Sequence, residues 1–373
     1  MVMDFIPFLK PRVVPKQYYQ RYLDEIDALR IYTNNGPLNK RFEKRILQEY
    51  FNSEGDVVTV SNATIGLLLA ISQLKRPGKY ALMPSFTFPA TPLSALWCGL
   101  EPYYIDIDQD HWCMDKQILE LALEKLGNKV AVVVPYATFG TELDLKYYDS
   151  LTQRGIPVVI DAASSFGTTI TEEAVSHFGG AMVYSFHATK SFGIGEGGVV
   201  YSGDREVIQR IRCSTNFGFN EERVSGQLGL NGKISEYTAA VGLATLDVFP
   251  EKVKIRERIG EWYKAVWNKY KLDELGWKLQ AASGEIGYQF FPLLCPDGQD
   301  NQHYVNKLHA SAIQVRTYFS PPCHQQKMFE QHPRTSLAIT ENISRRVLSL
   351  PVWEDINQEQ IDRIVRCLIN ESG

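Results

Sequence analysis

The sequence of 373 residues lacks the long apolar segments that anchor proteins in membranes. Its longest apolar runs, such as residues 130–135, have the length of a strand and fall far short of the roughly 18 residues that cross a bilayer. Residues 1–15 interrupt their apolar side chains with Asp4, Lys10 and Arg12, so they contain no secretory signal. We therefore expect a cytoplasmic protein with no membrane partner.

The sequence also has little excess of one charge sign over the other. The formal net charge is −4, and no stripe of Lys and Arg appears along the chain. Surfaces that bind nucleic acids or anionic lipids need such a clustered excess, so we expect no nucleic-acid partner. The apolar content of 44% is too high for a disordered chain, which leaves a folded globular protein.

Paired cysteines and paired metal ligands are missing as well. The six cysteines are scattered without a C-x-x-C motif, and the seven histidines form no pairs at helical spacing. Dispersed thiols in a chain of this length are typical of reduced core residues. The sequence therefore predicts neither a metal site nor a disulfide framework.

What the sequence does contain is a repeated alternation of strand-like apolar runs and stretches long enough for helices. Because the runs are continuously apolar, they indicate a mainly parallel sheet covered on both faces, and hence an α/β fold. The runs are residues 57–60, 80–83, 102–107, 130–134, 157–160 and 181–186. A nearly all-apolar helix, Ala63 to Leu74, follows the first of them.

The pattern changes near Pro250. A helix over residues 232–249 is expected to be interrupted by Pro250, and an amphipathic charged stretch follows to Tyr270. Strand-like runs at 287–294 and 314–319 and a final helix near 358–368 have the size of a second, smaller α/β domain. We therefore predict a large domain over residues 1–250 and a small domain over 251–373.

Polar residues gather where predicted strands end. In doubly wound sheets, ligands bind beyond the carboxyl ends of the strands, so the segments that follow the strands form the candidate site. Four such segments are expected at one edge of the sheet: residues 61–64, 84–88, 161–164 and 185–190.

Lys190 and Asp161 are the strongest candidates for a chemical role in these segments. Lys190 lies among small and apolar neighbours after a buried strand, where a poorly solvated amine stays nucleophilic enough for Schiff-base chemistry. Asp161 follows a buried strand and could keep a pyridine nitrogen protonated, so that the ring withdraws electrons. Taken singly, Lys190 fits a surface lysine on a turn better, and Asp161 is equally compatible with a helix N-cap.

The start of the apolar helix is suited to a phosphate. The free N–H groups of Ala63 and Thr64 and the helix dipole favour an anion, and the hydroxyls of Thr64 and Ser185 can add donors. The alternative is ordinary capping by Ser61 or Asn62. Phe88 could stack on a planar ring or could simply belong to the core.

A glycine motif competes with this interpretation. Residues 193–198 satisfy G-x-G-x-x-G, which in other contexts binds nucleotides. Here the motif leads into the strand-like residues 199–201, with no acidic strand end about twenty positions later, and no H-R-D or D-F-G follows. We therefore interpret these glycines as a tight turn after Lys190, against a kinase or a dehydrogenase.

Taken together, the segments resemble the sugar-nucleotide aminotransferases, pyridoxal-phosphate enzymes of fold type I that act on keto-deoxysugars. The resemblance covers nearly the whole chain and implies a mainly parallel seven-stranded sheet sandwiched by helices, with a smaller C-terminal α/β domain. Besides the four segments above, it includes Thr33-Asn34-Asn35-Gly36-Pro37, Gly195-Glu196-Gly197-Gly198, Asn231-Gly232-Lys233-Ile234-Ser235-Glu236 and Leu348-Ser349-Leu350-Pro351.

The resemblance also implies roles for the candidate residues. Lys190 would hold pyridoxal 5'-phosphate as an internal aldimine, with the pyridoxamine 5'-phosphate form appearing in turnover, and Asp161 would bind the pyridine nitrogen. Asn231 would reach the phosphate from the other subunit, which implies a homodimer with shared active sites. The remaining contacts would be Phe88 and Ser164 at the ring, Asn62, Ala63, Thr64 and Ser185 at the phosphate, and His187 and His324 at the substrate.

Two positions depart from the family pattern. Ser164 stands where the family usually has a Gln or His that contacts the cofactor's ring oxygen, and Lys233 stands where Arg is usual. The serine is shorter, and the lysine loses the bidentate fork of arginine. Both changes leave the chemistry in place and would alter substrate fit.

The variants around Thr33 to Pro37 and around Lys190 resemble members that aminate C4 of a nucleotide-linked 4-keto-6-deoxyhexose. The implied reaction takes an amino group from L-glutamate and makes an amino sugar for a surface polysaccharide such as the lipopolysaccharide O-antigen, or for a secondary metabolite. Alternatives are amination at C3, a pyridoxamine-dependent sugar dehydratase, which would carry His in place of Lys190, and a regulator, which would need a fused DNA-binding module.

Overall fold

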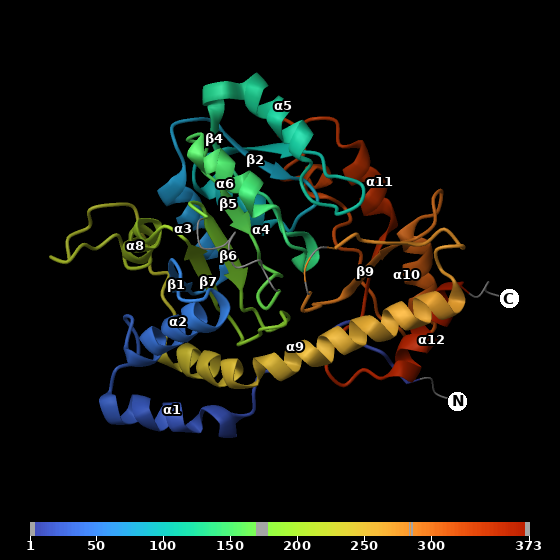
Figure 1. The fold of residues 1–373 in the computed structure, drawn as a ribbon, viewed down its shortest axis with the longest axis horizontal. Helices are drawn as coiled ribbons and strands as arrows, with labels where there is room; N and C mark the ends of the chain where they lie inside the picture. Colours follow the sequence, from blue (N-terminus) through green and yellow to red (C-terminus); the bar gives the residue numbers. More distant parts are fainter. Residues whose placement is uncertain (1–3, 169–177, 283, 285, 370–373) are drawn as a thin grey trace.

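The structure, a computed structural model, describes residues 4–168, 178–282, 284 and 286–369 (Figure 1). Its strands are β1 (Asp56–Val60), β2 (Tyr80–Pro84), β3 (Glu101–Ile105), β4 (Val130–Val133), β5 (Val159–Asp161), β6 (Ala181–Ser185), β7 (Gly198–Ser202), β8 (Lys278–Leu279), β9 (Phe291–Leu294) and β10 (Val347–Leu350). Its α-helices are α1 (Lys16–Leu29), α2 (Pro37–Tyr50), α3 (Ala63–Leu74), α4 (Ala90–Trp97), α5 (Lys116–Leu126), α6 (Leu145–Gln153), α8 (Arg205–Ser214), α9 (Glu236–Tyr270), α10 (Asn301–Ala310), α11 (Ala338–Arg346) and α12 (Gln358–Ile369).

The first seven strands form the central sheet. Strands β1-β7-β6-β5 pair in that order, and β3-β2-β4 form a second group. Two parallel bridges, Val133 to Val158 and Tyr136 to Asp161, join β4 to β5, so the order across the sheet is β1-β7-β6-β5-β4-β2-β3. Strand β7 runs antiparallel to both its neighbours, and the other pairs are parallel. The mainly parallel seven-stranded sheet is therefore confirmed.

Helices cover both faces of this sheet, as the continuously apolar strands predicted. Alternate residues along each strand enter different cores. Val57 of β1 and Tyr201 of β7 lie in the core beneath α2, α5, α6 and the first half of α9. Their neighbours Val58 and Val200 lie in the core beneath α3, α4 and α8. Both cores are closed to water, which explains why the strands have no polar face.

The predicted strands of the sheet are all present, with boundaries that differ by one or two residues. The helix Ala63–Leu74 is also present as expected. Two predictions for the C-terminal part are wrong. The run 287–294 forms a strand only over Phe291–Leu294. Residues 314–319 form no strand, because Arg316 alone bridges to Ser349 and two prolines, Pro321 and Pro322, follow without backbone donors.

The interruption predicted at Pro250 is also wrong, because α9 continues through it as one helix of 35 residues. It begins at Glu236 rather than at residue 232, and the Ser235 side chain accepts a hydrogen bond from the N–H of Thr238. A proline inside a helix costs about 3 kcal/mol, and burial on both sides of Pro250 offsets that cost. In Figure 1 the helix crosses the lower part of the molecule, above α1, and joins its two parts.

Different cores lie on the two sides of Pro250. Leu243 and Phe249 pack beneath the central sheet, whereas Tyr263 and Trp267 pack in a C-terminal core with the antiparallel sheet β10-β9-β8 and with α10 and α12. The N-terminal residue Ile6 also belongs to the C-terminal core, where it bridges to Ile313. The division into residues 1–250 and 251–373 stays a prediction, and the first residues pack outside it.

Candidate active site

The active-site candidates lie at the carboxyl edge of the central sheet, where three loops are joined by hydrogen bonds. The first turn of α4, which follows the loop after β2, contacts the end of β5 through Thr91 and Asp161. The loop after β5 contacts the loop after β6 through Ser164 and Lys190. Gly198 of β7 is the register partner of both Val60, at the end of β1, and Ser185, at the end of β6. The predicted convergence of these segments therefore follows from the topology of the sheet.

The amine of Lys190 points into this edge. The residue follows β6 in a turn closed by its own N–H, which donates to the carbonyl oxygen of His187 at 2.9 Å. Its Nζ lies 3.1 Å from the Ser164 hydroxyl and 3.1 Å from Oε1 of Gln289. Loss of hydration lowers the pKa of the Lys190 ammonium to about 8, against the opposing attraction of Asp161. The neutral, nucleophilic form of this amine is therefore more populated near physiological pH than that of an exposed lysine.

Asp161 is the last residue of β5 and is almost fully buried. Its Oδ2 accepts a hydrogen bond from the Thr91 hydroxyl at 2.6 Å, and its Oδ1 accepts one from the N–H of Ala163 at 3.1 Å. Burial raises the pKa of Asp161 above its usual value, although both donors and the Lys190 charge act in the opposite direction. A cationic partner would therefore gain a strong interaction with this carboxylate.

Thr91 is a supporting residue that the sequence did not single out. It lies in α4, fully buried, and its hydroxyl is 2.8 Å from that of Thr87, which belongs to the predicted segment 84–88. The hydrogen bonds from Thr87 to Thr91 and from Thr91 to Asp161 therefore hold the Asp161 carboxylate in place. In the sequence, the only indication of this role is two threonines four residues apart at the start of a helix. Their role becomes clear only from the contact with Asp161 in the structure.

The N-terminus of α3 lies beside the same edge. The Asn62 side chain accepts a hydrogen bond from the N–H of Ile65 at 2.9 Å, so Asn62 acts as the N-cap and the N–H groups of Ala63 and Thr64 stay directed away from the helix. A side chain at Gly198 would place its Cβ 3.1 Å from the Ala63 nitrogen. The same Cβ would lie 2.7 Å from the Tyr184 carbonyl oxygen, so the glycine allows β7 to pass close to β6 and to the start of α3, and Ser185 is its register partner.

Phe88 is 57% exposed, which is unusual for a large apolar side chain beside so many buried residues. It directly follows Thr87, so it belongs to the loop that holds Asp161 in place. Its predicted role as a ring that stacks on a planar ligand stays a prediction. The exposed ring face is consistent with it.

The glycine-rich segment, residues 193–198, forms a turn that packs against the loop that carries Lys190. The N–H of Ala188 donates to the carbonyl oxygen of Gly195, which has φ of +102°. A Cβ at Gly193 would lie 2.6 Å from the carbonyl oxygen of Ala188. The glycines therefore allow a close backbone approach, and the segment enters strand β7 rather than a helix. This is the tight turn that the sequence predicted in place of a nucleotide loop.

The two histidines expected near the substrate differ in their surroundings. His187 is partly buried beside Lys190, with Nδ1 at 2.8 Å from the Thr189 hydroxyl and Nε2 at 3.7 Å from Glu196. His324 is only 4% exposed: Nδ1 lies 2.7 Å from the Ser85 hydroxyl and Nε2 lies 3.3 Å from Glu341. His324 thus joins the end of β2 to α11, and its contact with substrate stays a prediction.

Asn231 lies on the segment that leads into α9. It bridges to Asn216, and its Oδ1 accepts a hydrogen bond from the Lys233 amine at 2.9 Å. The next residue, Gly232, accepts the N–H of Ser61 at 2.7 Å, which brings the segment beside the start of α3. The predicted contact of Asn231 with a phosphate of the other subunit stays a prediction.

Gln289 is the contact of Lys190 that sequence reasoning missed. It lies just before β9, in the part of the chain assigned to the C-terminal domain, and is 7% exposed. Its Oε1 also accepts a hydrogen bond from the Ser164 hydroxyl at 3.0 Å. A single amide between Tyr288 and Phe290 in an apolar run is the weak signal that could have drawn attention to it.

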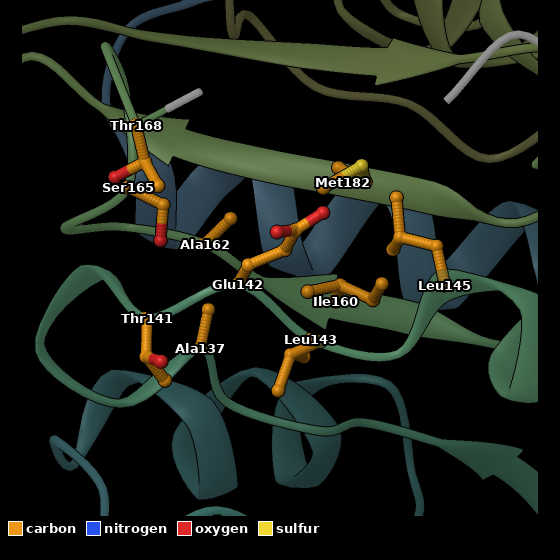
Figure 2. A pocket seen from close by; sticks show the side chains of 10 residues that line it. All are labelled: Ala137, Thr141, Glu142, Leu143, Leu145, Ile160, Ala162, Ser165, Thr168 and Met182. Carbon is orange, nitrogen blue, oxygen red and sulfur yellow. The ribbon is translucent and has the colours of Figure 1, made fainter. Parts of the chain in front are cut away.

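A small cavity lies beside the loop that carries Ala162 and Ser165 (Figure 2). Its walls are mainly apolar and include Ala162 and Met182, and neither Lys190 nor Asp161 lines it. The cavity of about 20 Å³ has room for about one water molecule, which is far too little for a cofactor. Lys190 and Asp161 therefore lie outside this cavity, at the carboxyl edge of the sheet.

Pyridoxal 5'-phosphate, the cofactor implied by the resemblance, fits the donor set at this edge. Lys190 offers an amine for its carbonyl carbon, and Asp161 offers a carboxylate for its ring nitrogen. The start of α3 offers N–H groups for its phosphate. Among the residues described here, no group of three or more His, Cys, Asp and Glu could hold a metal ion. The described helices include none that is long and apolar enough to span a membrane.

Comparison with known proteins gives a consistent result. A model of the DegT/DnrJ/EryC1/StrS aminotransferase family matches residues 16–369. A solved structure from Bacillus cereus, provisionally named a PLP-dependent aminotransferase, is 49% identical over 98% of this chain and 100% of its own, with a TM-score of 0.96.

Two curated relatives carry names that specify a reaction. The dTDP-4-amino-4,6-dideoxy-D-glucose transaminase of Escherichia coli is 27% identical and matches 98% of both chains. The UDP-N-acetyl-3-dehydro-alpha-D-glucosamine 3-aminotransferase of Acidithiobacillus ferrooxidans is 29% identical and matches 82% of both chains. These relatives act on different positions of their sugars, so similarity to them leaves the position open.

Proposed function

The chain belongs to the DegT/DnrJ/EryC1/StrS aminotransferase family, whose members depend on pyridoxal phosphate, and from this premise we propose its substrates. It transfers an amino group from L-glutamate to C4 of a nucleotide-linked 4-keto-6-deoxyhexose. The product is an amino sugar for a surface polysaccharide or a secondary metabolite, made in the cytoplasm.

One observation carries the chemical part of the proposal: the amine of Lys190 is held by two neutral acceptors beside the buried Asp161. With a pKa of about 8, the amine can act as the nucleophile that holds the cofactor and, once displaced by the donor, as the base that moves a proton. When bound, pyridoxal phosphate supplies an electron-poor ring that accepts the electron pair released at the donor's α-carbon. Asp161 would keep the ring nitrogen protonated.

The choice of a C4 ketone rests on the Thr33 to Pro37 and Lys190 segments and on the E. coli relative. The alternative is amination at C3, which the relative from A. ferrooxidans favours. A pyridoxamine-dependent dehydratase is disfavoured because such relatives carry His where this chain has Lys190.

A homodimer is part of the proposal. Trp97 at the end of α4 and Leu228 on the hairpin before α9 are each 78% exposed. Hydrogen bonds connect both regions to the end of α3, since Gln73 donates to the Leu228 carbonyl and Lys75 donates to that of Cys98. The hairpin projects beyond α8 (Figure 1) and leads to Asn231. Large apolar side chains in such exposed positions are typical of a surface that a second copy covers.

The test has two steps. Addition of L-glutamate to the yellow, cofactor-loaded protein should remove its visible absorbance, and the Lys190→Ala variant should show neither the band nor the loss. A panel of dTDP-, UDP- and GDP-linked 3-keto and 4-keto sugars should then yield one aminated product, identified by mass and NMR. A protein that stays colourless with pyridoxal phosphate would overturn the function, whereas a product aminated at C3 would overturn only the position.

A further inference from the structure

Lys190, Ser164 and Gln289 form a closed triangle of hydrogen bonds. Nζ of Lys190 donates to the Ser164 hydroxyl and to Oε1 of Gln289, each at 3.1 Å. The Ser164 hydroxyl donates in turn to the same Oε1 at 3.0 Å. Every side of the triangle has the length of an ordinary hydrogen bond, so the three groups fix one another.

The triangle suits a neutral amine. A neutral amine has two N–H donors and one lone pair, and the two acceptors use both donors, so the lone pair stays available for attack on a carbonyl carbon. Both acceptors are uncharged. A carboxylate in the place of the Gln289 amide would stabilise the ammonium form and would keep the amine protonated.

Gln289 is itself held by the long helix α9. The carbonyl oxygen of its neighbour Tyr288 accepts a hydrogen bond from Arg256 at 2.6 Å, and Arg256 pairs with Glu354 at 2.8 Å. The ring of Tyr288 packs so closely on α9 that a Cβ at Gly260 would lie 2.4 Å from it. These contacts leave the backbone at Gln289 little freedom, which an orienting side chain requires.

We infer that Gln289 is a positioning residue for the Lys190 amine and acts together with Ser164. This inference rests on the proposed function. Ser164 supplies only one of the two acceptors that orient the amine, and Gln289 supplies the second from a segment 125 residues away in the chain. The C-terminal part of the molecule thereby controls how the catalytic amine is presented.

The test uses the rate at which cofactor-free protein takes up pyridoxal phosphate, followed by the growth of visible absorbance. Gln289→Met keeps the length of the side chain and removes its acceptor, and the rate should fall about tenfold or more while the final absorbance is unchanged. Gln314→Met is the matched control. Gln314 accepts the N–H of Phe8 at 3.1 Å, and its variant should take up cofactor at the wild-type rate.

Two further variants separate positioning from a merely structural role. Moving the amide to the other segment, in the double variant Ser164→Gln with Gln289→Ser, should restore at least part of the rate lost in Gln289→Ser alone. Gln289→Glu should shift the pH midpoint of uptake upward. Within the part of the chain that the structure describes, the titratable groups that face this cluster are Asp161 of β5 and the hydroxyl of Tyr136. Burial raises the pKa of Tyr136, so this hydroxyl stays neutral over the range tested.

The outcomes are distinct. An uptake rate for Gln289→Met within about twofold of wild type would overturn the inference, since the lost hydrogen bond should cost more than that. If Gln289→Met does not fold, an unshifted pH midpoint in Gln289→Glu overturns it equally. Wild-type protein that takes up no cofactor would refute the proposed function, whereas uptake without an aminated sugar would refute the substrate and leave Gln289 testable.

Discussion

Two buried charged clusters of this protein use opposite arrangements. At the junction of α9 with the C-terminal core, Glu354 lies 2.8 Å from Arg256 and 3.4 Å from Lys252. Burial alone would raise the pKa of Glu354, but the two cations lower it below its usual value. At the sheet edge, Lys190 and Asp161 attract each other without a direct ion pair, and burial moves both pKa values towards the neutral forms.

The difference separates a structural cluster from a reactive one. In the α9 cluster each charge has its partner within the chain, so nothing is left for a ligand. At the edge, neutral acceptors hold the amine and a hydroxyl and an N–H hold the carboxylate, so each group keeps the capacity to bind a further partner. Changes at the edge should therefore alter chemistry, and changes in the α9 cluster should alter stability.

The most severe test of the reactive cluster is Lys190→Ala. It removes both the nucleophile and the proton carrier, so turnover with L-glutamate should fall by about 10⁴-fold or more. The visible band of the bound cofactor should also be absent. Retention of the band would assign the reactive amine to another lysine, and the matched Lys233→Ala variant should keep the band.

Asp161→Ala tests the second member of the same cluster. Without the carboxylate the ring nitrogen loses its proton, so the rate of the glutamate half-reaction should fall by about 10²- to 10³-fold. Ser164→Ala should cost about tenfold or less, because it removes one hydrogen bond. Stopped-flow absorbance measures both, and equal small losses in the two variants would contradict the division of roles.

Glu354→Gln tests the structural cluster. It leaves Arg256 and Lys252 without their anion, and the free energy of unfolding should fall by about 2–3 kcal/mol, as measured by urea denaturation. Glu359→Gln, an exposed change on α12, should alter stability by less than about 0.5 kcal/mol. The final visible absorbance of the loaded protein should be unchanged, and a loss of that absorbance would show that the α9 cluster is needed for cofactor binding itself.

The lowered pKa of Lys190 predicts an effect of pH on both reactivity and stability. Cofactor uptake should rise as the pH passes about 8, where the amine loses its proton. In cofactor-free protein the burial cost of the ammonium applies fully below about pH 8. It is relieved between that pH and the ordinary value of 10.5, because the unfolded chain then binds more protons.

A comparison of Lys190→Met with wild type checks the stability effect. At pH 7 the cofactor-free variant should be more stable by about 1–3 kcal/mol, and the difference should shrink towards pH 10. Thermal unfolding across this range measures it. A constant difference would mean that the amine is hydrated in the folded protein.

The sequence was informative where local pattern and site chemistry coincide. The apolar strands, the helix after Asn62 and the polar strand ends predicted the sheet and the positions of Lys190 and Asp161. Pro250 was misleading, because burial on both sides of it outweighs a local helix preference. Gln289 and Thr91 act through contacts between segments far apart in the chain, and no local pattern marks such contacts.

The continuous helix α9 has a consequence for dividing the molecule. Its first half completes the core beneath the central sheet and its second half completes the C-terminal core. Both cores therefore depend on one continuous helix. A gene cut at codon 250 would leave two fragments with exposed apolar faces and a split helix. Complementation by two fragments should therefore succeed with a break in an exposed loop outside α9 and fail at the apparent boundary.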